Sequence, residues 1–273
     1  MAATRAFTAV LGLVLATTTS AFALDISVLG GLTREFVAHP GERIEGKIIV
    51  NNTADKARVV KTYQTDYLHY ADGTSHYDAP GSAPRSNAGW IEFVPQQLEV
   101  PPDGSASIFY TIAVPQQEGL RGTYWSMLML EPLTEDSPEI AATDTEGRPA
   151  VAVRTVMRYA VQMVTDIGRT GSREVKFGGK TLQVSEGRHT LQVEVENTGE
   201  RWMQPVLWAE LYDPEGRSIG RFEGQRMRLF PGCSGRFGID LTGVPTGTYN
   251  ALIVADDGDD NVLGTQAKLE ISQ

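Results

Sequence analysis

The segment Val100-Pro101-Pro102-Asp103-Gly104-Ser105 leads into a run of alternating apolar and polar residues, and Leu229-Phe230-Pro231-Gly232-Cys233-Ser234 does the same later. Because proline presets φ and glycine accepts positive φ, both segments predict a tight turn before a strand. Each run is followed by a Val-Pro pair and a Gly-Thr-Tyr triplet. They lie at residues 114–115 and 122–124 in the first copy, and at residues 244–245 and 247–249 in the second. Landmarks repeated in the same order indicate a duplicated unit, and therefore two domains.

The pattern around these landmarks is typical of β-sandwiches. Runs rich in Val, Ile, Thr, Tyr and Phe alternate with period two and are broken by Gly, Pro and Asn. Strands are expected at residues 44–51, 57–70, 90–95, 105–114, 122–131 and 150–167, with loops at residues 71–89 and 133–149. No stretch has a helical period with caps. The predicted fold class is all-β, with two tandem immunoglobulin-like β-sandwich domains after a signal peptide.

The predicted domain boundaries follow from the ends of the duplicated unit. We place the first domain at residues 24–167 and the second at residues 168–273. The polar link at residues 168–172 is too short for the domains to tumble freely. A fixed or hinged angle, with a cleft between the domains, is therefore expected.

The first 23 residues predict a secretion signal. Arg5 supplies a basic start, residues 6–16 are largely apolar, and Ala21-Phe22-Ala23 fits a small-x-small cleavage site. The apolar run is too short to span a membrane well, and no later segment is long and apolar enough. The mature protein is expected in the periplasm, without stable membrane insertion.

Composition and motif content exclude several functional classes. The 24 Lys and Arg residues against 34 Asp and Glu give a formal net charge of −10, which disfavours nucleic acid as a partner. No Gly-x-Ser-x-Gly elbow and no His-Glu-x-x-His motif occurs, so the sequence predicts no enzyme and no cofactor. The single cysteine, Cys233, is either an ordinary turn residue or the site of an intermolecular disulfide.

Two segments contain residues of the types that bind metal ions. His69 and His76 flank a predicted loop and are candidate metal ligands; the alternative is that both side chains are exposed and solvated. The acidic residues 256–261 supply the oxygens that calcium prefers, but they lack EF-hand spacing. A solvated turn is the expected structure there.

The longest alternating run, residues 150–167, is the main candidate for binding. Its odd positions include Val151, Val153 and Met157, and its even positions include Arg154 and Arg158. Strands usually have five or six residues, so this one is expected to extend beyond its neighbours. The apolar odd face of residues 151–163 is then expected to contact a partner.

A series of motifs runs in order through the first half of the chain. They are Leu32-Thr33-Arg34-x-Phe36, Trp90-Ile91-x-Phe93-x-Pro95, Leu98-x-Val100-Pro101, Gly122-Thr123-Tyr124 and the long run at residues 150–167. In this order, residues 25–167 resemble the N-terminal domain of periplasmic pilus-assembly chaperones. The resemblance implies that the last strand is lent to a pilin subunit, a form of β-augmentation. It also implies that Arg34, together with Arg154 or Arg158, holds the subunit's C-terminal carboxylate.

The sequence therefore predicts a periplasmic, non-catalytic, chaperone-like protein that binds partner subunits by β-strand addition and an interdomain cleft. The predicted partner-binding residues are Arg34, Val151, Val153, Arg154, Met157 and Arg158. The alternative is a cell-envelope or surface adhesion module without chaperone activity, because residues 189–199 and 247–251 are similar to bacterial envelope immunoglobulin-like modules.

Overall fold

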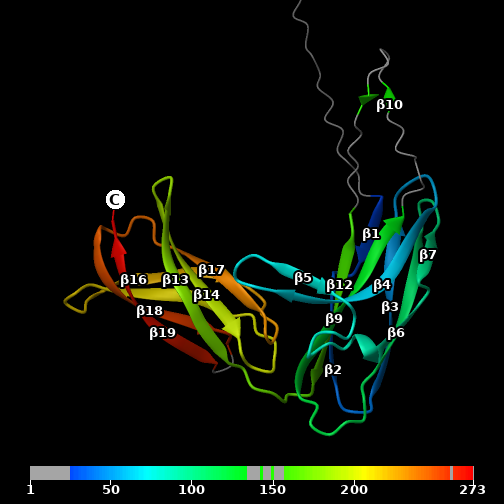
Figure 1. Cartoon of the computed structure of the whole chain (residues 1–273), viewed down its shortest axis with the longest axis horizontal. Helices are drawn as coiled ribbons and strands as arrows, with labels where there is room; N and C mark the ends of the chain where they lie inside the picture. Colours follow the sequence, from blue (N-terminus) through cyan, green and yellow to red (C-terminus); the bar gives the residue numbers. More distant parts are fainter. Residues whose placement is uncertain (1–24, 134–141, 144–148, 151–156, 259–260, 273) are drawn as a thin grey trace, which may run out of the picture.

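The chain folds into two β-sandwich domains side by side (Figure 1). The computed structural model describes residues 25–133, 142–143, 149–150, 157–258 and 261–272. Apart from one short 3-10 turn, η1 (Ala88–Trp90), every described element is a strand. The predicted all-β fold class with two immunoglobulin-like domains is confirmed.

The first domain consists of two packed sheets. One sheet has the order β1 (Ile26–Leu29), β3 (Arg43–Asn52), β8 (Ser105–Ala113), β6 (Ile91–Val94). The other has the order β2 (Thr33–Ala38), β12 (Tyr159–Ile167), β9 (Gly122–Leu133), β4 (Arg58–His69), β5 (Ser75–Asp78), and β7 (Gln97–Val100) also pairs with β4. A separate two-stranded unit joins β10 (Ala142–Thr143) to β11 (Pro149–Ala150). The four-stranded sheet facing β12, β9 and β4 is the arrangement of an immunoglobulin domain.

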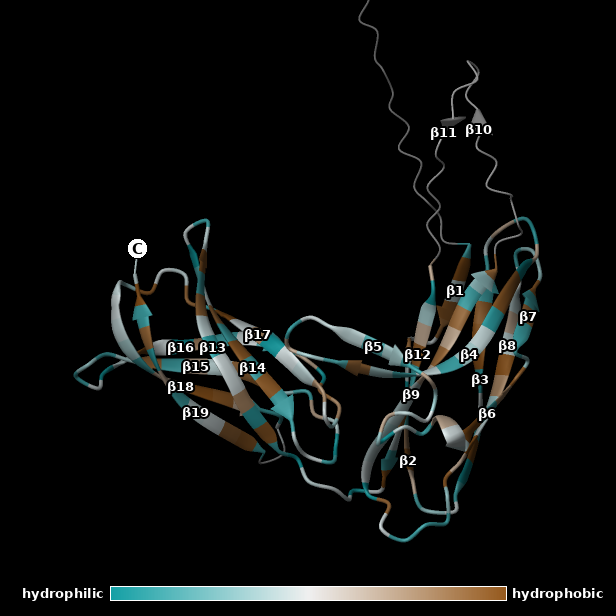
Figure 2. Ribbon diagram, viewed as in Figure 1, coloured by the Kyte–Doolittle hydropathy of each residue, from teal (hydrophilic) through white to brown (hydrophobic). Residues whose placement is uncertain are grey.

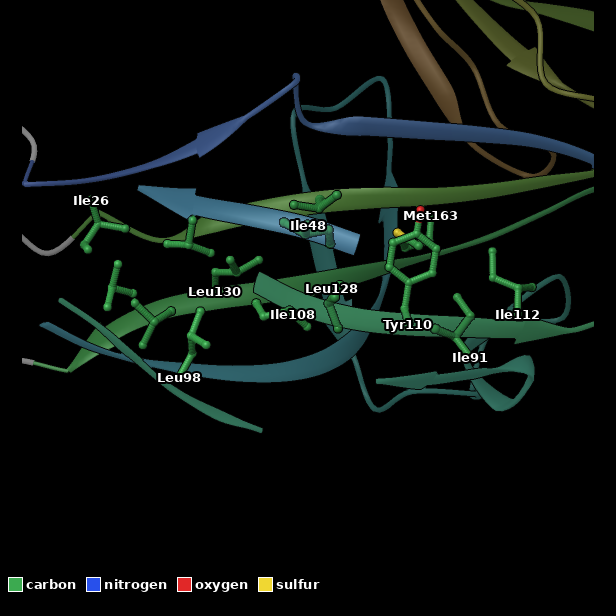
Figure 3. Packing of buried hydrophobic residues seen from close by; sticks show 14 of the residues in the cluster. Ile26, Ile48, Ile91, Leu98, Ile108, Tyr110, Ile112, Leu128, Leu130 and Met163 are labelled. Atoms are coloured by element: carbon green, nitrogen blue, oxygen red, sulfur yellow. The ribbon is translucent and has the colours of Figure 1, made fainter. Parts of the chain in front are cut away.

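The core of this domain lies between the two sheets. Ile48, Ile108 and Leu128 are fully buried and point toward one another from β3, β8 and β9 (Figure 3). Complete burial of an aliphatic side chain stabilises a fold by roughly 1.5–3 kcal/mol. The period-two pattern read from the sequence is therefore the inward face of each strand.

The second domain is a sandwich made from one continuous sheet of seven strands, which bends at one strand so that its two halves pack against each other. Its order is β13 (Val175–Ser185), β14 (Arg188–Asn197), β17 (Ser234–Asp240), β16 (Ser218–Arg226), β15 (Val206–Tyr212), β18 (Gly247–Asp256), β19 (Val262–Ile271). β16 pairs along β15 but meets β17 at one position, Gly224 with Ile239. The two halves pack around Val193, Leu207 and Phe237, and Figure 2 shows hydrophobic and hydrophilic residues mixed along these strands.

The repeated landmarks have the same structural role in both domains. Asn52 ends β3, Asn197 ends β14, and both side chains are buried. The Nδ2 of Asn52 donates to the carbonyl of Lys56 at 2.8 Å, and that of Asn197 donates to the carbonyl of Arg201 at 2.8 Å. The same two amides also donate to carbonyls at Val100 and Leu229, the residues that open the repeated turns. Each asparagine therefore ties a strand end to the turn before the next strand.

The tyrosine of the Gly-Thr-Tyr landmark behaves differently in the two domains. The hydroxyl of Tyr249 donates to the carbonyl of Pro245 at 2.9 Å and so ties the start of its strand to the backbone near a corner. Tyr124 instead packs against Trp90, with ring centroids 4.6 Å apart, and the Arg85 guanidinium lies over its ring.

Two predictions about the strands of the first domain are wrong. The expected loop at residues 71–89 contains β5 and η1, because the far end of β4 pairs with β5 in a hairpin. The expected continuous strand at residues 150–167 is interrupted: Ala150 pairs within the β10–β11 unit, and β12 begins only at Tyr159. Met157 and Arg158 precede β12 and lie in no strand.

The junction between the domains lies between β12 and β13. β12 ends at Ile167, β13 begins at Val175, and a turn at Thr170 separates them. The predicted division at residues 167 and 168 stays a prediction.

Candidate functional site

The pairing of β12 changes along its length. On one side it pairs antiparallel with β9 from Tyr159 to Ile167. On the other side it pairs parallel with β2, but only from Gln162 onward. Among the residues that the structure describes, no strand pairs with the second side of Tyr159, Ala160 and Val161. The start of β12 therefore presents a free backbone edge.

The orientation of this edge follows from one hydrogen bond. The Gln162 N–H donates to the carbonyl of Leu32 at 2.8 Å, so it points toward the β2 side. Successive residues of a strand direct their N–H and C=O groups to alternate sides, so those of Ala160 point the same way. Ala160 consequently offers a donor and an acceptor where β2 does not reach.

Exposed apolar side chains lie around the free edge. Leu29 and Leu32, on either side of the β1–β2 turn, are 47% and 44% exposed, and Met157, just before β12, is 45% exposed. The carbonyl of Leu32 already bonds Gln162, so this turn ends where the free edge begins. Apolar groups beside an unpaired strand edge are typical of a surface that pairs with another chain.

Arg34 of β2 holds the β1–β2 turn. Its guanidinium donates to the carbonyls of Leu29 and Gly31, both at 3.0 Å, and also to that of Gly30. Gly30 and Gly31 have φ of +82° and +81°, a conformation that glycine adopts without strain. The side chain that was predicted to anchor a carboxylate is thus engaged with backbone carbonyls here, and the anchoring role stays a prediction.

Arg34 also reaches toward the interior. Burial raises the pKa of the Tyr110 hydroxyl, and the nearby Arg34 charge opposes that rise. Tyr110 belongs to the core, where it meets Phe36 at a centroid distance of 6.0 Å. The guanidinium therefore lies where the N-terminal segment passes from one sheet to the other.

Arg158 lies beside β9. It forms an ion pair with Glu131 at 2.9 Å, and the other carboxylate oxygen of Glu131 accepts a hydrogen bond from the Tyr63 hydroxyl at 3.2 Å. Burial, and then the Glu131 charge, raise the pKa of Tyr63. Arg34 is opposite Met163, five residues along from Arg158, which corresponds to roughly 16 Å of strand. The structure does not bring these two arginines together.

The remaining predicted residues divide into two groups. Val151, Val153 and Arg154 lie outside the described residues. Val161 and Met163, from the odd face predicted to contact a partner, are fully buried in the core of their own domain, so that part of the prediction is wrong. The reason is that the odd face of β12 packs against the four-stranded sheet of the same domain, which the period-two pattern does not reveal.

An aromatic contact joins the two domains, and the sequence did not indicate it. Trp125 of β9 stacks on Phe230, with ring centroids 4.7 Å apart and an interplanar angle of 19°. Val164 and Cys233 complete this buried cluster. Trp125 and Val164 lie on the face of their sheet that points away from the first domain's core, so their burial comes from the second domain.

Polar contacts surround the aromatic cluster. The indole Nε1 of Trp202 donates to Asp166 at 3.2 Å, and Arg228 forms an ion pair with Glu35 at 2.7 Å. The Arg228 guanidinium also lies over the Trp202 ring, 4.1 Å from its centroid. These contacts favour a fixed angle between the domains, and the predicted interdomain cleft stays a prediction.

The chemistry of the described residues offers little for catalysis. Burial raises the pKa of the Cys233 thiol to about 11, so the thiol is neutral and shielded at neutral pH. In the described parts of the chain, no group of three or more His, Cys, Asp or Glu residues is placed to hold a metal ion. His76 lies in β5 rather than in the predicted loop, which corrects the sequence interpretation, and His69 ends β4 within the strand predicted at residues 57–70.

The acidic segment near the C-terminus is partly engaged. Asp257 accepts a hydrogen bond from the N–H of Gln204 at 2.6 Å and pairs with Arg173 at 3.6 Å. Asp259 and Asp260 lie outside the described residues. Within the described ranges, none of the helical elements has the length and apolar character needed to cross a membrane.

Comparison with known proteins found similar structures only. No protein-family model matches the sequence, and no curated protein matches it. The chain is similar to a chaperone–tip adhesin complex of CFA/I fimbriae biogenesis, with 10% identity and a TM-score of 0.49, covering 89% of this chain and 98% of the other. It is similar to the class 5 fimbriae chaperone CfaA, with 11% identity and a TM-score of 0.47, covering 91% and 100%.

A third similar structure comes from another type of pilus. It is the CsuC–CsuE chaperone–tip adhesion subunit pre-assembly complex from archaic Csu pili of Acinetobacter baumannii. The identity is 11% and the TM-score 0.46, covering 89% of this chain and 97% of the other. Each of the three is described as a chaperone of fimbriae or pili, or as a complex that contains one.

Proposed function

We propose that this chain is a periplasmic chaperone-like protein that captures partner subunits by adding one of their strands to the free edge of β12. The observation that carries the proposal is the unpaired side of Tyr159, Ala160 and Val161. An extended partner segment would satisfy the outward N–H and C=O of Ala160, as in other cases of β-augmentation.

The surroundings of the edge favour an apolar, extended partner. Leu29, Leu32 and Met157 are exposed beside it, and alternate side chains of an added strand would contact them. The sequence resemblance points to a pilin-like subunit as the class of partner. Arg34, Met157 and Arg158 stay proposed contact residues, as do Val151, Val153 and Arg154 outside the described residues.

The test is a pull-down of the tagged mature protein from its own periplasm, followed by mass spectrometry. Ala160→Pro removes the outward N–H without touching the β9 ladder, because the Ala160 N–H does not face β9. Ala160→Val keeps this N–H and is the matched control. We expect the wild type and Ala160→Val to retain a β-rich subunit, and Ala160→Pro to lose at least about tenfold of it, equivalent to about 1.4 kcal/mol.

Two results would contradict the proposal. If Ala160→Pro, folded by circular dichroism, captures the subunit as well as the wild type does, the β12 edge is not the binding site. If cell-wall fragments rather than a protein subunit are retained, the chain is an envelope adhesion module.

A further inference from the structure

His69 lies in the interface between the two domains. It ends β4, next to a hairpin that reaches the second domain, where the Ala71 N–H donates to Ser234 Oγ at 2.9 Å. Figure 1 shows this hairpin extending from the first domain toward β17. The imidazole forms a hydrogen bond with the backbone of Arg228, and the Cys233 thiol forms one with the backbone of His69. His69 therefore touches the second domain through both its ring and its backbone.

The imidazole has one nitrogen without a partner. Its Nδ1 is buried and makes no hydrogen bond within the described part of the chain. The ring also stacks on Tyr67, with centroids 5.7 Å apart, and the Tyr67 carbonyl accepts a hydrogen bond from the Trp125 indole at 3.0 Å. The histidine is thus connected to the tryptophan that makes the aromatic contact between the domains.

The charged groups on the surrounding elements do not compensate a proton on this ring. From the second domain, Arg228 adds a positive charge, and its own counterion is Glu35 of β2. On the hairpin, Asp66 accepts hydrogen bonds from Ser86 and from the Ala83 N–H, while Asp72 accepts from Thr74.

Two further groups complete these surroundings. Asp166 of β12 bonds Trp202 and lies 3.8 Å from Arg201. The Cys233 thiol, with its pKa raised by burial to about 11, stays neutral through the physiological range. A protonated His69 would therefore add an unsatisfied N–H and a second positive charge beside Arg228.

We propose that His69 makes the docking of the two domains sensitive to pH, with the neutral ring allowing the docked arrangement and the protonated ring loosening it. Burial lowers the pKa of His69, and the hydrogen bond to the Arg228 backbone opposes part of that change. This inference does not depend on strand addition at β12.

The direction of the effect follows from linkage. An undocked His69 has the ordinary histidine pKa of about 6.5, so the undocked form binds a proton more readily than the docked form. Docking is then complete above that pKa and weakens as the pH falls through it toward the lower docked value. Within that window the docking equilibrium constant falls by up to about tenfold per pH unit.

The first test measures the distance between the domains in the full mature chain. Spin labels at Lys47→Cys and Thr248→Cys, one exposed site in each domain, report this distance by pulsed electron resonance. The buried Cys233 should stay unlabelled, which the wild type checks. We expect one narrow distance distribution at pH 7.5 and a broader one at pH 5.5, where carboxylates remain ionised.

Variants of two histidines assign the response. His69→Gln, neutral at both pH values, should keep the narrow distribution throughout. His76→Gln, at an exposed position on the same hairpin, should respond to pH as the wild type does. A wild-type distribution unchanged by pH, or a pH response that survives in His69→Gln, would overturn the proposal.

A second measurement does not require a variant to fold. Magnetic resonance titration of the His69 ring should give a pKa below the ordinary histidine value of about 6.5, because burial lowers it. If His69 titrates at the ordinary value, its ring is not desolvated and the proposal is wrong.

Discussion

Each domain contains a buried asparagine, Asn52 or Asn197, that ties a strand end to the turn before the next strand. The two domains differ in how their first strand pairs. In the first domain the N-terminal segment divides into β1 and β2, which join opposite sheets, and β2 begins opposite Gln162, three residues after the start of β12. In the second domain β13 pairs with β14 along almost its whole length. The shared sequence landmarks thus give both domains similar cores. The pairing of the first strand determines where, among the described residues, a backbone edge has no neighbouring strand.

The outer edge of the second domain carries features that discourage pairing. β13 has a register shift between Phe177 and Lys180, and it also bears Lys176. Bulges and lysines on an edge strand oppose the addition of another strand. The free edge of β12 has neither at Ala160 and runs in continuous register with β9. This difference favours the β12 edge over the β13 edge as the proposed site of strand addition.

The largest expected effect comes from replacing the buried asparagine that each domain contains. Asn52→Leu and Asn197→Leu each leave buried backbone carbonyls without donors, so we expect each to lower the free energy of unfolding by about 3 kcal/mol. Urea denaturation followed by tryptophan fluorescence measures this. Asn250→Leu, at an exposed position, is the control, with an expected change below about 0.5 kcal/mol. A loss of less than about 1 kcal/mol in either domain would mean that the repeated asparagine is not equivalent there.

An intermediate effect concerns the contact that joins the domains. Trp125→Ala and Phe230→Ala should show a coupling energy of about 1 kcal/mol in a double-mutant cycle, because stacked aromatic pairs contribute that much beyond burial. Thermal unfolding of the two single variants and the double variant provides the cycle. Strictly additive effects would show that the two rings contribute separately and do not link the domains.

The smallest effect compares one surface ion pair in each domain. Arg158 pairs with Glu131 in the first domain, and Arg236 pairs with Glu194 at 2.8 Å in the second. Both arginines are substantially exposed, so Arg158→Ala and Arg236→Ala should each change stability by less than about 1 kcal/mol. Partner capture should fall only for Arg158→Ala if that side chain contacts the subunit. An equal fall for Arg236→Ala would place the contact elsewhere.

The sequence predicted the fold through features that are local along the chain. Alternating residues such as those of β8, and the turns at Pro101 and Pro231, specify strands and corners through nearest-neighbour geometry. The same reasoning failed for residues 71–89, because β5 is a short, fully exposed strand without an apolar alternation to reveal it. It also failed at Ala150, whose pairing partner Ala142 lies in the segment predicted as a loop.

The candidate site was predicted only in part. The sequence singled out the segment containing β12 as a partner-binding strand, but it assigned Val161 and Met163 to a partner when they belong to the core. An apolar side chain has the same pattern whether it faces its own domain or another chain, so periodicity alone does not separate the two cases. The free edge at Ala160 depends on where β2 begins, which is a property of pairing between distant segments.

By itself, then, the sequence determined two all-β domains and their shared turns, because turn geometry and period-two burial act over a few residues. Only the tertiary structure decided which side of β12 stays unpaired among the described residues, and that Trp125 and His69 face the second domain. Those features arise where segments far apart in the chain meet, and their burial depends on what covers them.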